Sequence, residues 1–584
     1  MLGDQTYRLP FVICLFLSGV AQWDSTAVCH GAEGDHSASI DKLFEQWNRP
    51  DTPGFSVGVI FNGNFVHKRG YGVANLDANI PITSKTSFDV MSLAKSFTTA
   101  CTARLIDQGA FTPDSDIRTF VPELPEYTDP ITIRHLLTCR SGLRDFYHLM
   151  ILLGRSEQDA YTKSDVLDVI SRQKAPMFKP GSQFAYSNSD YFLLALVIER
   201  ATGKTFREVT SEQLFEPLGM HQTFFDDDEA LPRKHRAIGH SCIGDGPYRR
   251  YGLNSSTVGP WRLMTTVDDM LRWDASFSNN VLRSGKHLSE FHKKGSLFDN
   301  EKCLSAFPKR THNGLKRVWY TGGGLGFQAH FVRFPDHGLS IVAFGNVSTA
   351  KAWDDMARTL PKVADLYLAA ETESPASEEL WLPHDAANVA LTETEMEEVA
   401  GKVTGEYRSS YGYFVQVSAR AQKLQFQWLF FDYALQGPEP LVAVASDRLR
   451  TSRGYSEFEL LLDEGSGKRP LIHIEHRDGR KEMWRPVEFV IPDAEQLASF
   501  EGDYFCTDLE SVYRISAVDG KLCIQFNYGR KRWLTPTVSD TFRTTKERFN
   551  GMVFTFSRDA TGSITGFEVD FDRIKSLRFV KRSS

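Results

Sequence analysis

Ser92 and Lys95 stand three residues apart at the start of an amphipathic pattern that runs to Gln108 and stops at Gly109. On a helix this spacing puts both side chains on one face, so the lysine amine can reach the serine hydroxyl. Partial burial can lower the pKa of the amine until it accepts the serine proton, and the N-terminus of a helix favours developing negative charge. The pattern predicts Ser92 as a nucleophile and Lys95 as its base. The alternative is a surface serine cap beside a solvated lysine.

Two other serines have comparable patterns. Ser56 lies in Gly54-Phe55-Ser56-Val57-Gly58, which matches a Gly-x-Ser-x-Gly nucleophile elbow, and Ser39 precedes Lys42 with the Ser-x-x-Lys spacing. An elbow needs a strand that turns sharply into a helix, whereas Ser56 lies inside a predicted strand that continues to a hairpin turn at Asn62-Gly63. Ser92 is preferred to Ser39 because it opens a strong helical pattern.

The tripeptide Tyr186-Ser187-Asn188 precedes another helical pattern, from Asp190 to Thr202. A tyrosine hydroxyl beside an ammonium group can lose its proton and relay it between nucleophile and leaving group. Asn188 would supply amide hydrogen bonds to the lysine or to substrate. Taken alone, the same tripeptide is consistent with a half-buried tyrosine of the core.

A glycine-rich strand edge follows at Tyr320-Thr321-Gly322-Gly323-Gly324. Glycines leave space beside a strand, so a substrate backbone could pair closely there, and Tyr320, Thr321 and Gly322 are candidate substrate-binding residues. The N–H groups of Gly323 and Ser92 together could form an oxyanion hole. The alternative is a phosphate-binding loop, but such a loop requires a following helix, and none is predicted here.

The elements that must position these residues change type along the chain. Strand patterns come first, helical patterns follow, and strand patterns return near residue 319 before a last helix. This order predicts an α+β domain whose sheet is completed from both ends of the sequence. The predicted ranges are strands at Phe55–Phe61, Phe65–Lys68, Gln328–Phe334 and Leu339–Phe344, helices at Ser92–Gln108 and Asp190–Thr202, and a last helix at about Trp353–Ala369.

A second region begins after an acidic segment rich in Ser and Pro, residues 371–390, which has the composition of a linker. Beyond it, short alternating strands are separated by Gly and Asp turns. Gly405-Glu406-Tyr407 and its following strands resemble Gly502-Asp503-Tyr504 and the strands after that. We expect two all-β modules, at residues 391–488 and 493–584, each a small antiparallel barrel or sandwich.

The composition is that of a soluble globular protein, with 41% hydrophobic and 24% charged residues. Its 584 residues suffice for three or four compact units of roughly 150 residues each. The net charge of -7 and the pI near 6.2 argue against nucleic acid and anionic membranes as partners.

The N-terminus has the pattern of an export signal. Arg8 precedes the apolar run Leu9–Leu17, and Gly19-Val20-Ala21 supplies small residues for cleavage, so residues 1–21 are predicted to be a signal peptide and the protein to be secreted or periplasmic. The alternative is an uncleaved anchor, but the run is shorter than the roughly 20 residues of a membrane-spanning helix.

Together, the three motifs resemble the serine β-lactamase and penicillin-binding-protein-like superfamily, particularly its class C and esterase branch, over residues 38–370. Further matching phrases are Gly70–Asn75, Ile133–Thr138, Ser141–Leu143 and Pro217–Met220. The resemblance implies a β-lactamase-like domain with an antiparallel sheet, flanking helices and a helical subdomain. It also implies that Ser92 attacks a carbonyl, that Lys95 and Tyr186 shuttle its proton, that an acyl-enzyme forms, and that no metal or organic cofactor is needed.

The two β modules after the hydrolase domain make the layout similar to that of bacterial D-aminopeptidases, which implies small peptides with an N-terminal D-residue as substrates. The alternatives are an esterase, a β-lactamase or DD-carboxypeptidase activity, and a catalytically weak protein that binds peptidoglycan-like peptides. One departure bears on this choice: Tyr320 stands where the family has Lys or His. That cation helps to hold a substrate carboxylate, so its absence favours esters or amines.

Overall fold

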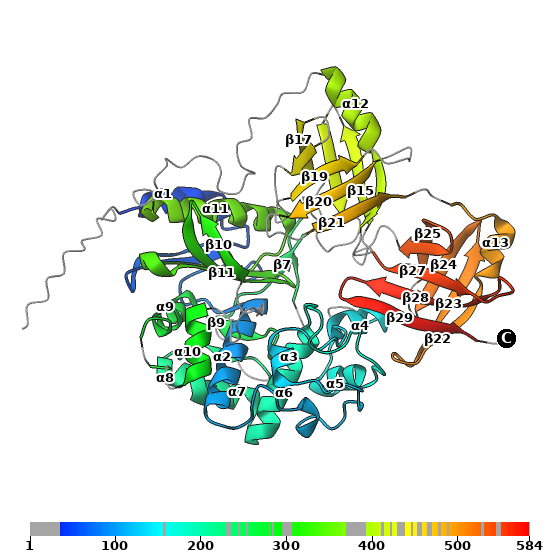
Figure 1. Cartoon of the computed structure of the whole chain (residues 1–584). Coiled ribbons are helices and arrows are strands. Elements are labelled where there is room, and N and C mark those ends of the chain that lie inside the picture. The colour runs from blue at the N-terminus through cyan, green and yellow to red at the C-terminus, as the bar shows by residue number, and fades with distance from the viewer. Residues whose placement is uncertain are drawn as a thin grey trace, which may run out of the picture.

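The computed structural model describes a first domain of helices and strands and two β modules that follow it (Figure 1). The described residues are 35–155, 159–228, 235–242, 246–252, 255–279, 281–282, 285–294, 307–368, 393–409, 414–420, 423–428, 439–445, 448–451, 458–463, 470–476, 481–487, 490–526, 529, 531–544 and 551–582. The predicted signal peptide and the predicted linker at 371–390 lie outside them. Within the described part of the chain, no helix is both long and apolar enough to cross a membrane.

An antiparallel sheet of six strands forms the centre of the first domain, in the order β10-β11-β12-β13-β1-β2. N-terminal strand β1 pairs with β13 from the end of the domain, so the sheet is completed from both ends of the sequence as predicted. The hairpin between β1 and β2 turns at Asn62 and Gly63, which both have positive φ. The strands are β1 Phe55–Phe61, β2 Asn64–Tyr71, β10 Phe307–His312, β11 Leu315–Gly324, β12 Phe327–Phe334 and β13 Leu339–Gly345.

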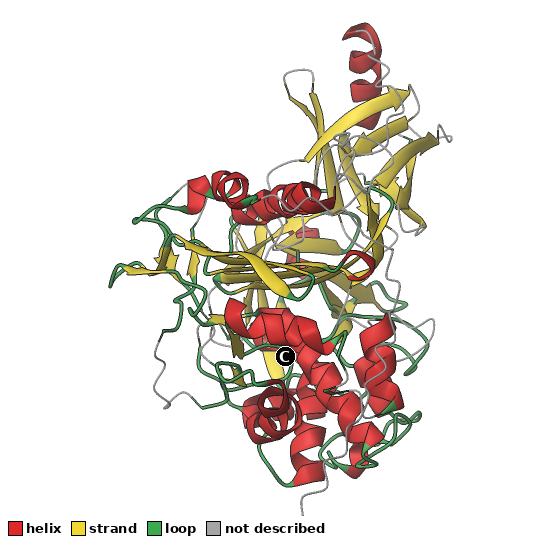
Figure 2. Cartoon of the chain, turned by 90° about the vertical axis from the view of Figure 1, so that its left-hand side faces the viewer, coloured by secondary structure: helices red, strands yellow, loops and turns green. Residues whose placement is uncertain are grey.

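Helices cover both faces of this sheet (Figure 2). On one face, α1 (Ser37–Leu43) and α11 (Ala350–Leu368) pack over an apolar cluster that includes Trp47, Phe55, Ile341 and Met356. On the other face lie α9 (Val267–Ser276) and the helical subdomain. The remaining helices of this side are α2 Ala94–Asp107, α3 Ile133–Leu137, α4 Phe146–Leu152, α5 Lys163–Ser171, α6 Asn188–Thr202, α7 Phe206–Thr210, α8 Glu216–Leu218 and α10 Lys286–Lys294.

Helices α2 and α6 carry the first two motifs and lie deep in the core. All of α2 from Ala94 to Ile106 except Arg104 is buried, because its neighbours enclose it on every side. Helix α6 is capped by the Ser187 hydroxyl, which accepts a hydrogen bond from the Asp190 amide, and it ends at Gly203 in the left-handed conformation. The helices predicted at these positions are confirmed, with α6 starting two residues earlier.

The two β modules are closed antiparallel barrels of eight strands each, so the barrel alternative is correct and the sandwich is not. Helix α12 (Glu393–Val403) precedes the first barrel and α13 (Ala494–Ser499) precedes the second. The first contains β14 Gly405–Ser409, β15 Phe414–Arg420, β16 Lys423–Trp428, β17 Glu439–Ala445, β18 Arg448–Thr451, β19 Phe458–Asp463, β20 Leu471–His476 and β21 Lys481–Pro486. The second contains β22 Gly502–Cys506, β23 Ser511–Val518, β24 Lys521–Phe526, β25 Lys531–Pro536, β26 Thr541–Thr544, β27 Val553–Arg558, β28 Ile564–Phe571 and β29 Ile574–Lys581.

The repeated Gly-acid-Tyr sequence has the same structural role in both barrels. The buried Tyr407 hydroxyl donates to the Val403 carbonyl at 2.9 Å, and the buried Tyr504 hydroxyl donates to the Phe500 carbonyl at 2.6 Å. Each tyrosine thus joins the first strand of its barrel to the helix before it.

The second barrel packs against the first domain next to α4 (Figure 1). Its Tyr513 hydroxyl donates to the Leu152 carbonyl at the end of that helix. From the first domain, the Arg144 guanidinium donates to the Lys575 carbonyl at 3.2 and 3.3 Å. These contacts place the β28–β29 hairpin beside the residues of the first two motifs.

Candidate active site

Ser92 lies on a short turn of 3-10 helix, Met91–Leu93, that leads directly into α2. Met91 has a φ of 49°, a left-handed conformation that disfavours a side chain by about 1–2 kcal/mol. The Asp89 carboxylate accepts a hydrogen bond from the Met91 amide at 2.9 Å and holds this turn in place. The strained residue therefore directly precedes the predicted nucleophile and determines how Ser92 enters the helix.

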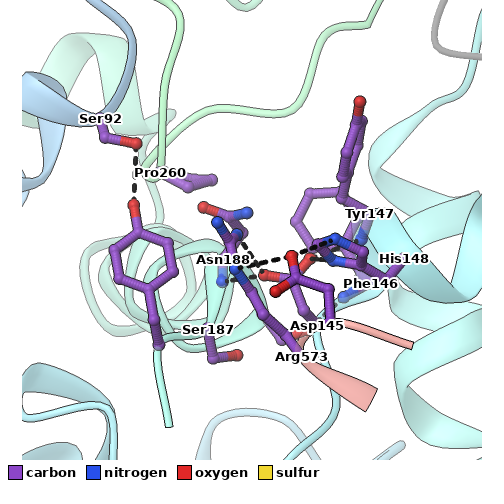
Figure 3. Close-up of polar contacts among 12 residues, drawn as sticks. Ser92, Asp145, Phe146, Tyr147, His148, Ser187, Asn188, Pro260 and Arg573 are labelled. Atoms are coloured by element: carbon purple, nitrogen blue, oxygen red, sulfur yellow. Dashed lines mark hydrogen bonds and ion pairs between the residues drawn. The ribbon is translucent and has the colours of Figure 1, made fainter. Parts of the chain in front are cut away.

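Two side chains converge on the Ser92 hydroxyl. Lys95 Nζ lies 3.2 Å from Ser92 Oγ, and the Tyr186 hydroxyl donates to the same oxygen at 2.8 Å. Figure 3 shows Ser92 facing the segment that carries Ser187 and Asn188. The structure therefore brings the first two motifs together around one oxygen atom, although 94 residues separate Ser92 from Tyr186.

Lys95 is fully buried, and its amine has two further partners: Asn188 Oδ1 at 2.9 Å and the Pro260 carbonyl at 3.0 Å. Burial lowers the pKa of Lys95 to about 7. Both of these partners can only accept hydrogen bonds. A neutral amine therefore donates its two protons to them and directs its lone pair at the third neighbour, the Ser92 hydroxyl, which is the orientation that a general base needs.

Burial acts in the opposite direction on Tyr186 and raises its pKa to about 12, against a lowering influence from the nearby Arg573 guanidinium. The hydroxyl is therefore protonated at neutral pH and donates to Ser92. The sequence pattern predicted a tyrosine that loses its proton because an ammonium group lies nearby, whereas the structure favours a neutral tyrosine beside a largely neutral amine above pH 7. In this state Lys95 can accept a proton and Tyr186 can donate one.

Asp145 holds the start of α6 in place through a hydrogen bond. Its fully buried carboxylate accepts from the Asn188 amide at 2.8 Å and from the Tyr147 amide at 3.0 Å. Burial alone would raise the pKa of Asp145, but the hydrogen bond from His148 and the charges of Arg573 and His148 hold it below its usual range. A buried anion thus fixes the residue whose side chain holds Lys95.

His148 and the hairpin of the second barrel extend this charged group (Figure 3). His148 Nδ1 lies 3.2 Å from Asp145 and its Nε2 lies 2.9 Å from Asp572. Although burial opposes the charged form, the two carboxylates raise the pKa of His148 to about 9, so it is a cation at neutral pH. Arg573 completes the group, with its Nη1 3.3 Å from Asp145.

The third motif passes very close to the nucleophile. A Cβ at position 322 would lie 2.8 Å from the Ser92 amide nitrogen and 2.1 Å from the Val90 carbonyl oxygen, so only glycine fits there. A Cβ at Gly323 would lie 1.9 Å from the Trp353 ring. The Ser92 amide and the strand that carries Gly323 are therefore neighbours, as an oxyanion hole requires, and the hole itself stays a prediction.

Tyr320 lies in the core, with only 2% of its surface exposed. Its ring stacks on Phe331 at 5.7 Å and contacts Phe277 at 6.3 Å. The neighbouring Thr321 is half-buried. The proposed contributions of Tyr320, Thr321 and Gly322 to substrate binding stay predictions.

The two competing serines lie away from this group. Ser56 is fully buried in β1 and donates to the Thr83 carbonyl at 3.1 Å, so it sits in a strand as expected. Ser39 and Lys42 are exposed on α1.

Five residues described above were not among the predicted site residues: Asp145, His148, Pro260, Asp572 and Arg573. Asp145 could have been noticed only as a helix cap, since its carboxylate accepts from the Tyr147 amide at the start of α4. Pro260 contributes a backbone carbonyl, which has no side-chain signature. Arg573 lies 428 residues beyond Asp145, in another domain, and no local pattern marks it.

Comparisons with known proteins concern the family and the fold. The family model described as Beta-lactamase matches residues 40–364. A D-aminopeptidase of Cereibacter sphaeroides is 32% identical over 302 residues, which cover 50% of this chain and 57% of that protein. Protein flp of Staphylococcus aureus is 25% identical over 327 residues, 54% of this chain and 64% of that protein. The chain therefore matches somewhat more than half the length of each of these relatives.

Among solved structures, the octameric penicillin-binding protein homologue from Pyrococcus abyssi superimposes with a TM-score of 0.51 at 19% identity. The match covers 77% of this chain and 98% of that chain. At this identity the likeness concerns the fold.

Proposed function

The chain belongs to the β-lactamase family, and we propose that it is a serine hydrolase that cleaves small peptides or amides with a D-residue on the acyl side, through a covalent acyl-enzyme on Ser92. The observation that carries this proposal is the convergence of Lys95 and Tyr186 on Ser92 Oγ, at 3.2 and 2.8 Å. A base and an acid on one hydroxyl are what acyl transfer to serine requires.

The first half of the reaction uses both groups in turn. Neutral Lys95 accepts the Ser92 proton as Oγ bonds to the substrate carbonyl carbon, and the N–H groups of Ser92 and Gly323 hold the resulting oxyanion. The tetrahedral intermediate then collapses. The carbon–nitrogen bond breaks while Tyr186 protonates the leaving nitrogen, and the Lys95 ammonium returns a proton to the tyrosine. The net result is an ester on Ser92 and transfer of the serine proton to the leaving amine.

Water completes the cycle by the same steps in reverse. As it attacks the ester carbonyl, its proton passes to Tyr186 while the Tyr186 proton passes to Lys95; the bond to Ser92 Oγ then breaks, the Lys95 ammonium returns a proton to Ser92, and the free acid leaves. The preference for a D-residue is supported by the similarity to D-aminopeptidases, one of which is 32% identical over half of the chain.

The test compares the wild-type protein with Ser92→Ala on four substrates: D-alanyl p-nitroanilide, L-alanyl p-nitroanilide, p-nitrophenyl acetate and a chromogenic cephalosporin. Ser39→Ala is the matched control, since Ser39 has the same spacing to a lysine but is exposed on α1. We expect cleavage of the D-anilide, a loss of at least about 1,000-fold in Ser92→Ala, and no change in Ser39→Ala.

Mass spectrometry of the quenched reaction is expected to show the acyl group on Ser92. Cleavage of the ester alone would replace the peptidase proposal with an esterase, and cleavage of the cephalosporin would indicate a β-lactamase. Full activity in Ser92→Ala would refute the site, whereas no cleavage and no label in the wild-type protein would indicate a binding protein.

A further inference from the structure

Arg573 brings a side chain of the second barrel into contact with Tyr186 and Asp145. It lies at the turn between β28 and β29, and Figure 3 shows it extending from this hairpin toward Asn188 and Asp145. Its guanidinium carbon lies 4.3 Å from the centroid of the Tyr186 ring. A cation from another domain therefore stacks on the residue that protonates the leaving group.

The hairpin holds this position firmly. The Asp572 carboxylate forms an ion pair with His148 Nε2 at 2.9 Å, and the Phe571 ring meets the His148 ring edge-on with their centroids 5.2 Å apart. On the far side of the turn, Arg144 binds the Lys575 carbonyl. Contacts on both sides of Arg573 thus fix the backbone from which its side chain reaches the site.

The guanidinium retains unused donors. It has five N–H groups, and within the described part of the chain one of them donates to Asp145 at 3.3 Å. The contact with Asp572 at 3.7 Å is too long for a hydrogen bond. The Arg573 side chain is 32% exposed, whereas the Asp145 side chain is 0% exposed. Arg573 therefore carries a positive charge and N–H groups that have no partner in the described part of the chain, on a side chain that is partly exposed where that of Asp145 is not.

The position of Arg573 indicates which part of a substrate it meets. The Tyr186 hydroxyl must reach the leaving nitrogen, so the leaving group lies next to the tyrosine and hence next to the guanidinium on its ring. In a dipeptide, the leaving nitrogen and the free carboxylate belong to one amino acid, about 3.5 Å in length. Arginine binds carboxylates through paired hydrogen bonds.

We propose that Arg573 binds a carboxylate on the leaving group, so that the preferred substrates are dipeptide-like molecules that release a free amino acid. The inference rests on the proposed function for its acyl-transfer chemistry, but not on the D-configuration of the acyl group. It also revises the expectation drawn from Tyr320. The cation missing from the third motif favoured uncharged esters or amines, whereas the second barrel supplies a cation from elsewhere.

The test measures a ratio of two kcat/KM values, for D-alanyl-glycine and for its neutral analogue D-alanyl-glycinamide. The substrates differ only in the charge at the end of the leaving group. We expect the wild-type protein to prefer the free acid by at least about tenfold, and Arg573→Gln to lower this ratio by about 10- to 100-fold, as for loss of a charge-assisted hydrogen bond. Arg573→Lys is expected to lie between the two, because it keeps the charge but not the paired donors.

Arg578→Gln is the matched control, because it makes the same change at an exposed position of β29. The ratio does not depend on the amount of active protein, so partial misfolding of a variant leaves it readable. Equal losses on both substrates in Arg573→Gln would overturn the inference and show that the residue acts only by holding Tyr186 or Asp145. A wild-type protein that does not distinguish the substrates would also overturn it.

A second substrate pair separates this inference from the proposed function. 3-Acetoxybenzoate and 3-acetoxybenzamide are acetyl esters whose leaving groups differ in the same charge and which need no D-residue. If D-peptides are not cleaved but the esters are, the peptidase proposal fails, while an Arg573-dependent preference for the benzoate still supports the carboxylate site. If neither pair is cleaved, both proposals fail.

Discussion

Asn188→Asp tests whether Lys95 acts as a neutral base. The substitution changes size very little but puts a carboxylate about 2.9 Å from Lys95 Nζ, where the amide oxygen now lies. At that separation the attraction is about 6 kcal/mol for an effective dielectric constant of about 20. Opposite charges this close raise the pKa of an amine by roughly 1–3 units in proteins. Taking about two units as the working value moves the pKa of Lys95 from about 7 to about 9.

The consequence is a shift of the acid limb of the pH–rate profile. Only the neutral amine accepts the serine proton, so wild-type kcat/KM is expected to rise with pH through about 7 and then level off. In Asn188→Asp the neutral fraction of Lys95 at pH 7 falls from about one half to about 1%, so kcat/KM at pH 7 is expected to fall about 50-fold. Most of the activity is expected to return by pH 10, where the amine is again largely neutral.

The assay is kcat/KM for D-alanyl p-nitroanilide from pH 5 to 10.5. Asn188→Ala is the control, because it removes the same hydrogen bond without adding a charge and should not move the limb upward. A uniform loss in Asn188→Asp at every pH, with the limb still near pH 7, would show that Lys95 is not the titrating base.

Two further predictions concern the other groups around Ser92. Tyr186→Phe should reduce cleavage of the anilide by at least about 100-fold but cleavage of p-nitrophenyl acetate by less, because an amine must be protonated as it leaves and p-nitrophenolate need not be. Equal losses on both substrates would contradict the role of Tyr186 as the acid. Gly322→Ala should abolish cleavage of all substrates, since its Cβ would lie 2.1 Å from the Val90 carbonyl and 2.8 Å from the Ser92 amide. Labelling of Ser92 by a fluorophosphonate at the wild-type rate in that variant would disprove the close approach.

Much of the site could be predicted because its chemistry follows from short segments. Ser92 and Lys95 face the same way on a helix, and the strong helical pattern that Ser92 opens favoured this pair over Ser39 and Lys42, which have the same spacing. Tyr186 and Asn188 precede α6, and the glycines of the third motif mark a strand that another backbone approaches. The repeat around Tyr407 and Tyr504 likewise predicted two similar modules, although not that each closes into a barrel of eight strands.

The remaining features depend on contacts between distant parts of the chain. The Pro260 carbonyl, which helps to orient the Lys95 amine, lies 165 residues from Lys95 along the chain. Because every residue has a backbone carbonyl, nothing in the sequence marks this one. Arg573 reaches the site only because the second barrel packs against α4. The absence of a basic residue at position 320 was visible in the sequence, but its replacement by a cation from another domain was not.

By itself, the sequence determined which residues can do chemistry here and which local elements carry them, because helix and strand periodicities and glycine requirements act over a few neighbouring residues. Only the tertiary structure decided the protonation states and the partners. The same Lys95 would remain an ammonium ion in water. Its full burial, against Asn188 and the Pro260 carbonyl, lowers its pKa to about 7, because a charge loses its hydration when the folded chain surrounds it.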